Sequence, residues 1–350
     1  MTYYKIEPVD TLFFRDGRPY NMEEKQMNVE SIFPPSPYTV AGAIRASLAL
    51  NIGWDGKGDW DNNIKAKLGD GNNLGPLKFS GPYITKGDEI LFSVPRCLMG
   101  RKVSNKDNKW ENFARLKPGT GIKSDAGNIR YPVLEGNTEK MKNIAGYVTF
   151  EDMKKLLWND NIEDIKIILN DDIWKKEPNV GIKRKESTLN VEEGNLFSRS
   201  FVRLGRKINI VSGVTGIDEE LKGTLMLGGE AKAAYISKAG DVKLPEVKVN
   251  KLKKFSAVFI TPGKIENLKP GESVEGLPEE AKLVSACVDR PQMIGGWDFN
   301  KGPMPLKPYL RTGTTLFFES DTEIDITKYN GKKIGKNTEF GFGQILIGKW

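Results

Sequence analysis

The chain has 350 residues, with 53 Lys and Arg against 46 Asp and Glu, and a formal net charge of +7. Apolar residues make up 38% and charged residues 28%, which supplies a core and is too even a mixture for a disordered chain. Histidine is absent, and the only two cysteines, Cys97 and Cys287, lie far apart in the sequence. This composition excludes Ser-His-Asp and Cys-His nucleophile systems, histidine acid–base catalysis and a structural zinc site. The length predicts about two domains.

The start of the chain and its cysteine content bear on location. Charged residues within positions 1–10 stand where a signal peptide needs an apolar run, and no stretch approaches the ~18 uncharged apolar residues of a membrane span. Low cysteine usage suits a reducing cytoplasm. We therefore expect a soluble, cytoplasmic protein with no membrane partner.

Along the chain, clusters of glycine and proline separate short apolar runs, a pattern that predicts an α+β fold dominated by strands. A helix is predicted to begin at Ser36 and Pro37, with apolar residues following at helical spacing. A second is predicted over about 151–158 after a capping Thr149, whereas residues 162–169 fit either a helix or a strand. Strands are predicted at 3–9, 90–95, 196–204, 225–227, 231–236, 255–261, 281–288, 314–319 and 344–347.

Three polar, glycine-rich connectors are predicted to be exposed loops or insertions, at residues 51–75, 102–128 and 268–280. The chain is predicted to cross between two halves around 175–180. The corresponding domains are residues 1–178 and 179–350.

Two stretches imitate ligand loops but lack the required chemistry. The glycine-rich stretch 331–337 is one residue short between its glycines, and Asn337 stands where a magnesium-holding Ser or Thr is needed. The stretch 59–70 has the spacing of a calcium loop, yet Ile64 stands where the sharp turn requires glycine. The Gly341-Phe-Gly343 turn lacks the strand-then-helix setting of a dinucleotide site. The sequence thus predicts no cofactor and no metal site.

Residues 180–207 contain seven Lys and Arg against three Glu. If 197–204 is a strand, its period of two places Phe197, Arg199, Phe201 and Arg203 on one face. Alternating rings and guanidinium groups suit single-stranded nucleic acid, because bases stack on rings while arginine meets phosphates. The alternative is an ordinary strand with its phenylalanines in the core and its arginines at the margin.

Several motifs together resemble the RAMP superfamily of CRISPR-associated proteins, and within it the family of the third subunit of the type III-B Cmr complex. They are residues 7–19 (EPVDTLFFRDGRP), 33–45 (FPPSPYTVAGAIR), 227–230 (LGGE), 294–298 (IGGWD) and 341–343 (GFG). The resemblance implies two packed ferredoxin-like (RRM-like) domains with long insertions, and a glycine-rich loop before the final strand. No motif of the family covers residues 100–128.

The resemblance also implies a role in antiviral defence. Such a subunit holds the 5′ tag of the crRNA and docks against the large polymerase-like subunit and the adjacent backbone RAMP subunit. Related proteins that process precursor crRNA often use a catalytic histidine, so the absence of histidine agrees with a non-catalytic role. The predicted RNA-binding residues are Arg15, Arg18, Ser36, Tyr38, Thr39, Arg45, Lys183, Arg184, Lys185, Arg199, Arg203, Gly295, Gly296, Trp297, Gly341 and Gly343.

Two other functions stay open at this point. One is a metal-independent endoribonuclease of the same superfamily, which would use Tyr, Lys or Ser to position a 2′-hydroxyl for attack on the adjacent phosphate. The other is a purely structural subunit whose basic face meets an acidic partner. The Phe/Arg alternation at 197–203 favours RNA over the structural role.

Overall fold

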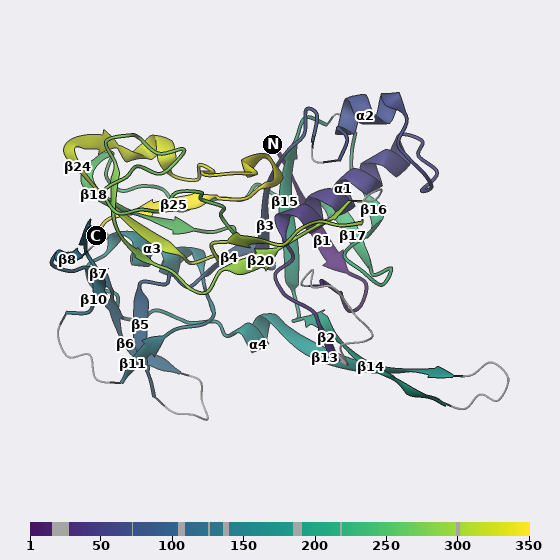
Figure 1. Cartoon of the computed structure of the whole chain (residues 1–350), viewed down its shortest axis with the longest axis horizontal. Coiled ribbons are helices and arrows are strands. Elements are labelled where there is room, and N and C mark those ends of the chain that lie inside the picture. Colours follow the sequence, from purple (N-terminus) through teal and green to yellow (C-terminus); the bar gives the residue numbers. More distant parts are fainter. Residues whose placement is uncertain are drawn as a thin grey trace.

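The computed structural model of the chain describes residues 1–15, 28–71, 73–103, 109–124, 127–135, 140–184, 191–217, 219–298 and 302–350. Two antiparallel sheets, each with its own hydrophobic core, lie side by side in the structure (Figure 1). Strands dominate and helices are few, as predicted for an α+β chain. None of the described helices combines the length and the apolar character that a bilayer crossing requires.

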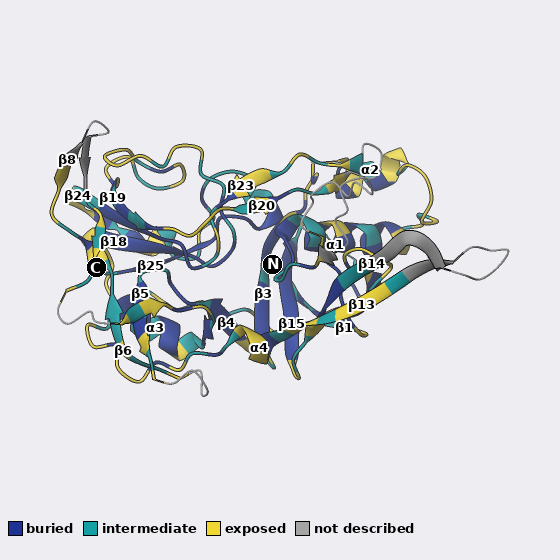
Figure 2. Cartoon of the chain, turned by 60° about the horizontal axis from the view of Figure 1, so that its bottom comes forward, coloured by how far each residue is buried: buried dark blue, intermediate teal, exposed yellow. Residues whose placement is uncertain are grey.

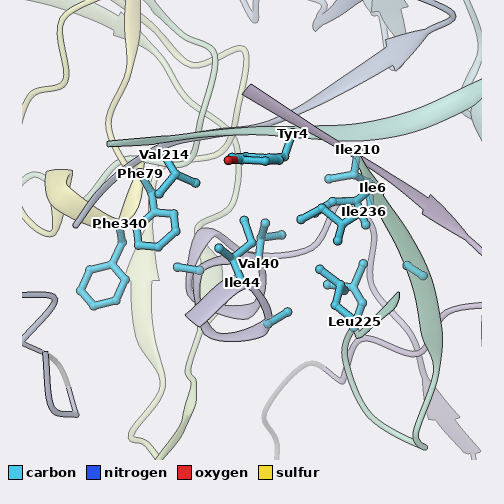
Figure 3. Close-up of a cluster of buried hydrophobic side chains, with 14 of the residues drawn as sticks. Tyr4, Ile6, Val40, Ile44, Phe79, Ile210, Val214, Leu225, Ile236 and Phe340 are labelled. Carbon is cyan, nitrogen blue, oxygen red and sulfur yellow. The ribbon is translucent and has the colours of Figure 1, made fainter. Parts of the chain in front are cut away.

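The larger sheet has seven strands in the order β12-β4-β3-β15-β1-β17-β16. Helix α1 (Pro37–Asn51) packs on one face of it, and the close-up of this core shows Val40 and Ile44 among the side chains of the strands (Figure 3). The strands are β1 (Thr2–Pro8), β3 (Lys78–Lys86), β4 (Glu89–Ser93), β12 (Tyr147–Val148), β15 (Ile208–Thr215), β16 (Gly223–Met226) and β17 (Ala233–Lys238).

The second sheet has the order β19-β24-β18-β25 and packs with helix α3 (Phe150–Trp158). Its core contains the stacked rings of Phe255 and Phe318, whose centroids lie 5.2 Å apart. The buried residues of α3 recur at helical spacing. The strands are β18 (Lys251–Phe259), β19 (Lys282–Cys287), β24 (Thr315–Asp325) and β25 (Ile345–Gly348).

Smaller elements extend from the two sheets. A long hairpin, β13 (Trp174–Arg184) and β14 (Val191–Leu204), projects away from them and pairs with β2 (Asn28–Glu30) (Figures 1 and 2). An arm over 292–309 consists of β20 (Gln292–Ile294), β21 (Trp297–Asp298), β22 (Gly302–Pro303) and β23 (Lys307–Tyr309). The rest are α2 (Asn62–Leu68), α4 (Asn170–Ile173), β5 (Leu98–Lys102), β6 (Trp110–Arg115), β7 (Lys117–Pro118), β8 (Ile122–Ser124), β9 (Gly127–Ile129), β10 (Pro132–Val133), β11 (Met141–Asn143), η2 (Ile326–Tyr329) and η3 (Thr338–Phe340).

Both predicted helix starts are confirmed. The Ser36 hydroxyl accepts a hydrogen bond from the backbone N–H of Thr39 at 3.2 Å, and Thr149 caps α3 in the same way at Asp152. Each cap satisfies one of the backbone donors that a helix N-terminus leaves without a partner. Each of the nine predicted strands overlaps a strand of the structure.

Several connecting segments contain more regular structure than the loop prediction gave them. The predicted loop 102–128 contains β6, β7 and β8, and the predicted loop 51–75 contains α2, which Asp61 caps. Residues 175–180 lie inside β13, an edge strand whose backbone pairs with β14 while most of its side chains in this segment face solvent. Residues 162–169 form neither a regular helix nor a strand, and Ile168 bridges to Tyr147.

The predicted division at 178/179 stays a prediction. The seven-stranded sheet takes strands from both sides of it, since β15 and β17 pair with strands of the first 178 residues and β16 pairs with β17.

The C-terminal glycine turn joins the two sheets. Gly341 has a φ of +105°, and a Cβ at this position would lie 2.3 Å from the carbonyl oxygen of Gly81 in β3. Nearby, the Tyr83 hydroxyl of β3 donates a hydrogen bond to the Gln344 side chain at 2.5 Å. The turn therefore requires glycine both for its left-handed backbone and for its close contact with β3.

Replacing this glycine should destabilise the fold. We expect Gly341→Ala to lower the free energy of unfolding by roughly 2–4 kcal/mol, because the backbone is strained and the methyl group overlaps β3. Urea unfolding followed by tryptophan fluorescence measures it. The control is Gly271→Ala, which has a φ of +83° but open space around its Cβ, and it should cost only about 1 kcal/mol. Equal losses in the two variants would contradict a packing role for Gly341.

Candidate nucleic-acid interface

Phe201, Arg199 and Arg203 lie on one face of strand β14, as predicted, but the Phe201 ring is buried in the core. Phe201 is buried and packs against Phe13 with ring centroids 5.4 Å apart, while the Lys232 ammonium lies 4.4 Å from the Phe201 centroid. Arg199 and Arg203 keep partly exposed side chains on the same face. The structure therefore agrees, at Phe201, with the alternative interpretation of an ordinary strand that buries its phenylalanine and keeps its arginines at the margin. The side chain of Phe197 lies outside the described residues.

The two arginines of this face are paired with carboxylates of the same chain. Arg203 contacts Asp10 at 3.0 Å and also pairs with Glu177, while Arg199 pairs with Glu230. Hydrogen bonding from Arg203 holds the pKa of Glu177 below its ordinary value. The pKa of Asp10 is lowered first by the backbone N–H of Thr11 and then by Arg203. RNA phosphates would have to compete with these carboxylates for the arginines.

The remaining basic residues of the prediction are only partly visible. Arg15 is exposed, and its backbone bridges to Ser31. Lys183 and Arg184 belong to β13, but their side chains lie outside the described residues, as do Arg18 and Lys185 altogether.

At the start of α1, the predicted side chains are occupied by contacts within the protein. The Ser36 and Thr39 hydroxyls lie 3.0 Å apart. Tyr38 packs edge-on against Phe340 and Phe342, with centroids 4.7 and 4.8 Å away. Its hydroxyl lies 3.2 Å from that of Tyr309, and burial raises its pKa. These contacts join α1 to the C-terminal turn.

Arg45 also makes its contacts within the protein. Its guanidinium donates hydrogen bonds to the carbonyls of Leu68, Gly71 and Asn73 at 3.0, 2.8 and 3.3 Å. The side chain is buried and lies 5.1 Å from the Trp60 ring centroid. Arg45 thereby holds the segment after α2, and its donors face inward instead of toward a surface.

The predicted glycines serve close contacts inside the fold. Gly341 and Gly343 are buried in the turn, and a Cβ on Gly343 would lie 2.0 Å from the Ile334 carbonyl oxygen. In the arm, a Cβ on Gly295 or Gly296 would meet Met304, between β22 and β23, at 3.0 or 2.9 Å. Trp297 beside them is 69% exposed, so its ring is open to a partner.

The structure reveals a basic groove that the sequence analysis missed. A pocket of about 420 Å³ lies between the base of the hairpin, the end of β4 and the base of the arm. Phe33 and Trp174, whose ring centroids lie 5.7 Å apart, form one side of it. We call this pocket the junction groove and define its charged lining as Arg96, Lys176, Arg311 and Glu30.

Three cations and one carboxylate thus line the junction groove. Lys176 pairs with Glu30 at 2.7 Å, and Arg96 pairs with Asp289 at 3.1 Å. Arg311 is exposed and donates from Nε to the Arg290 carbonyl at 2.9 Å. Within the described part of the chain, Arg311 makes no ion pair, so its guanidinium can meet an anion without displacing a carboxylate.

The sequence offered little signal for this groove. Its charged residues come from positions 30, 96, 176 and 311, which are far apart in the sequence. Phe33 and Pro34 of the lining belong to the 33–45 motif, and none of the four charged residues belongs to a motif. Folding brings the four together because β2, β13 and the base of the arm meet at the end of β4.

The ion pairs of Arg203 lead to a pH-dependent prediction. Because the folded pKa of Glu177 lies below its unfolded value near ~4.3, the pairing stabilises the fold above that value and is lost as the pH falls through the folded pKa. Arg203→Gln should raise the pKa of Glu177 toward its ordinary value, and that of Asp10 less, since Thr11 still donates to it. Carboxyl ¹³C NMR titrations measure both, and unchanged midpoints would argue against the pairing in solution.

Comparisons with known proteins agree with this fold. The family described as CRISPR-associated protein (Cas_Cmr3) matches residues 4–350. None of the curated proteins matches the chain. Two similar solved chains come from cryo-EM structures of the Type III-B Cmr-beta bound to cognate target RNA, one of them also with AMPPnP. Both solved chains are 16% identical to this one, and each match covers 90% of this chain and 86% of the solved chain. The TM-score is 0.52 for the structure with AMPPnP and 0.51 for the other, which shows a similar fold. Since the family match spans nearly the whole length, the chain belongs to the CRISPR-associated Cmr3 family.

Proposed function

We propose that this protein is a non-catalytic, RNA-binding subunit of a type III-B CRISPR effector complex, and that it holds the 5′ tag of the crRNA. Family membership over residues 4–350 supports a role within such a complex. The similar solved chains belong to an assembly bound to target RNA, which supports RNA as the ligand class.

The junction groove is the observation that carries the RNA-binding proposal. It combines Arg311, whose guanidinium makes no ion pair with a described residue, with two further cations and a pair of aromatic rings. Single-stranded RNA is recognised by this combination, because phosphates pair with cations and unstacked bases lie on rings or guanidinium planes. Hydroxyl groups of Ser93 and Thr312, 2.8 Å apart, line the same pocket and can read base edges or 2′-hydroxyls.

The hairpin face is proposed as a second, weaker contact. Arg199 and Arg203 reach solvent there, but Asp10, Glu177 and Glu230 balance their charge together with that of Lys232. Long-range attraction of RNA to this face is therefore small. Trp297 at the arm offers an exposed ring for stacking.

We also propose that each large sheet is the core of a ferredoxin-like (RRM-like) unit. Four consecutive strands of the first sheet run β17-β1-β15-β3, and the second sheet runs β25-β18-β24-β19. Numbered by chain order, both sets read 4-1-3-2, the strand order of the ferredoxin-like fold. Helix α1 connects the first and second strands of the first set, as that fold requires.

The proposed partners follow from membership in such a complex. They are the large polymerase-like subunit and the adjacent backbone subunit, in addition to crRNA. The endoribonuclease and the purely structural subunit are the competing functions, and the two experiments below separate them from the tag-binding role.

Removing the Arg311 charge should weaken RNA binding. We expect Arg311→Gln to bind a 5′-tagged crRNA about tenfold more weakly. The slope of log K against log salt concentration should become shallower by about one, because one phosphate contact is lost. Fluorescence anisotropy at several salt concentrations, with a scrambled-tag RNA for comparison, measures both. Arg101→Gln is the matched control, because Arg101 is exposed and paired with Glu111 on β5 and β6. Unchanged affinity and salt slope for Arg311→Gln would remove the junction groove from the RNA site.

The RNA should stay intact. After incubation with the protein, we expect a denaturing gel to show full-length crRNA, because the chain holds no histidine for acid–base chemistry at the phosphate. Site-specific shortening of the tagged RNA would instead establish the endoribonuclease. Failure to bind either RNA in this assay, with the fold intact, would favour the purely structural subunit.

A further inference from the structure

A second pocket lies at the opposite end of the molecule from the hairpin. It has a volume of about 260 Å³ and lies between β6, the end of α3 and the second sheet, near the C-terminus (Figure 1). Its walls combine apolar residues, among them Phe113, Phe317 and Trp350, with five charged residues: Arg115, Lys117, Lys349, Glu135 and Asp160. Neither the RNA site nor the junction groove includes any of these residues.

The charges in this pocket do not balance. Lys349 pairs with Asp160 at 2.7 Å, and Lys117 lies 3.8 Å from Glu135. Arg115 has only one hydrogen bond, from its guanidinium to the Lys155 carbonyl at 3.1 Å, and makes no ion pair among the described residues. Among the described residues, three cations therefore face two carboxylates in this pocket, and the Arg115 guanidinium lies near Asp160 without forming an ion pair with it.

An uncompensated charge in this position costs free energy. Burial lowers the pKa of Arg115, which the nearby Cys97 and Asp160 partly oppose. A partly buried cation without a counterion is unfavourable, and it becomes favourable when an anion with good geometry joins it. Arginine binds carboxylates through two parallel N–H groups, which makes it suited to this task.

The surroundings select the kind of anion. Asp160 and Glu135 have exposed fractions of 92% and 77% and lie at the rim, where they repel a polyanion such as an RNA backbone. The small volume admits a side chain or a small organic acid and is less than most ligand pockets offer. Trp350 is partly buried and lines the pocket, with the buried Phe317 behind it at a centroid distance of 5.7 Å. The Arg130 and Lys254 cations lie 5.6 and 5.1 Å from the Trp350 ring centroid.

We propose that the Arg115 pocket is a binding site for a single carboxylate on an apolar stem, supplied by an acidic side chain of another protein chain or by a free organic acid. The carboxylate pairs with the Arg115 guanidinium, and the stem packs against the partly exposed rings of Trp350 and Phe113. The rim carboxylates exclude nucleic acid from the same position. This site is independent of RNA binding in the junction groove.

The test follows the guanidinium and indole signals of the full chain by ¹⁵N–¹H NMR. The probes are 3-phenylpropionate, its amide, the peptides Ac-Leu-Glu-Leu-NH₂ and Ac-Leu-Gln-Leu-NH₂, inorganic phosphate and a short single-stranded RNA. We expect the two carboxylates to shift the Arg115 Nε–H and Trp350 indole signals at millimolar concentration, and the two amides to leave them unchanged. Tighter binding of the glutamate peptide would identify a protein side chain as the source, and tighter binding of 3-phenylpropionate a free acid.

Variants separate the site from a structural role of Arg115. Arg115→Gln should raise the concentration of carboxylate needed to shift the Trp350 signal about tenfold, whereas Arg115→Lys should retain part of the affinity. Arg101→Gln, on β5, should bind as the unaltered chain does. Equal shifts by acid and amide, or a response to phosphate or RNA at lower concentration than to carboxylate, would overturn the proposal. The readout does not involve crRNA, so its failure leaves the proposed function untouched.

Discussion

The contact between the C-terminal turn and β3 holds the two sheets in one arrangement. Gly341 lies against the Gly81 carbonyl, and Tyr83 of β3 reaches across to Gln344. Strand β3 is buried on both faces as a result, because one face packs on the core around α1 and Tyr83 packs on the other core. The position of the arm, and with it the junction groove, depends on this contact, since Tyr309 at the end of the arm packs on Phe342.

Charge compensation distinguishes the surfaces of the protein. The arginines of the hairpin face suggest a polyanion site, but carboxylates from the turn after β1, from β13 and from the 227–230 motif neutralise them. The guanidinium groups of Arg311 and Arg115, which make no ion pair within the described part of the chain, lie instead in separate pockets at different parts of the fold. Local pairing therefore decides where an anion can bind, and the formal charge of +7 by itself does not.

The motif residues that suggested RNA contact have a second explanation in the structure. Arg45 and Tyr38 make hydrogen bonds and ring contacts within the protein, and Gly343 permits a close backbone approach to Ile334. Buried contacts such as these restrict which residue can occupy a position, just as contact with a ligand does. Membership in a motif therefore does not by itself indicate RNA contact. RNA contact by the exposed members, such as Trp297, stays a prediction.

The sequence by itself determined the α+β class, the two helix caps at Ser36 and Thr149 and the positions of nine strands, because capping and hydrophobic patterns are local. It did not identify β3 and β15, which lie in the middle of the large sheet. Both are buried on two faces, so they lack the alternation that marks a half-exposed strand. The pairing of Arg199 and Arg203 with distant carboxylates, and the gathering of Arg96, Lys176 and Arg311 in one groove, were decided by the tertiary structure alone. Ion pairs and pockets join residues far apart in the chain, and no local pattern records which of them will meet.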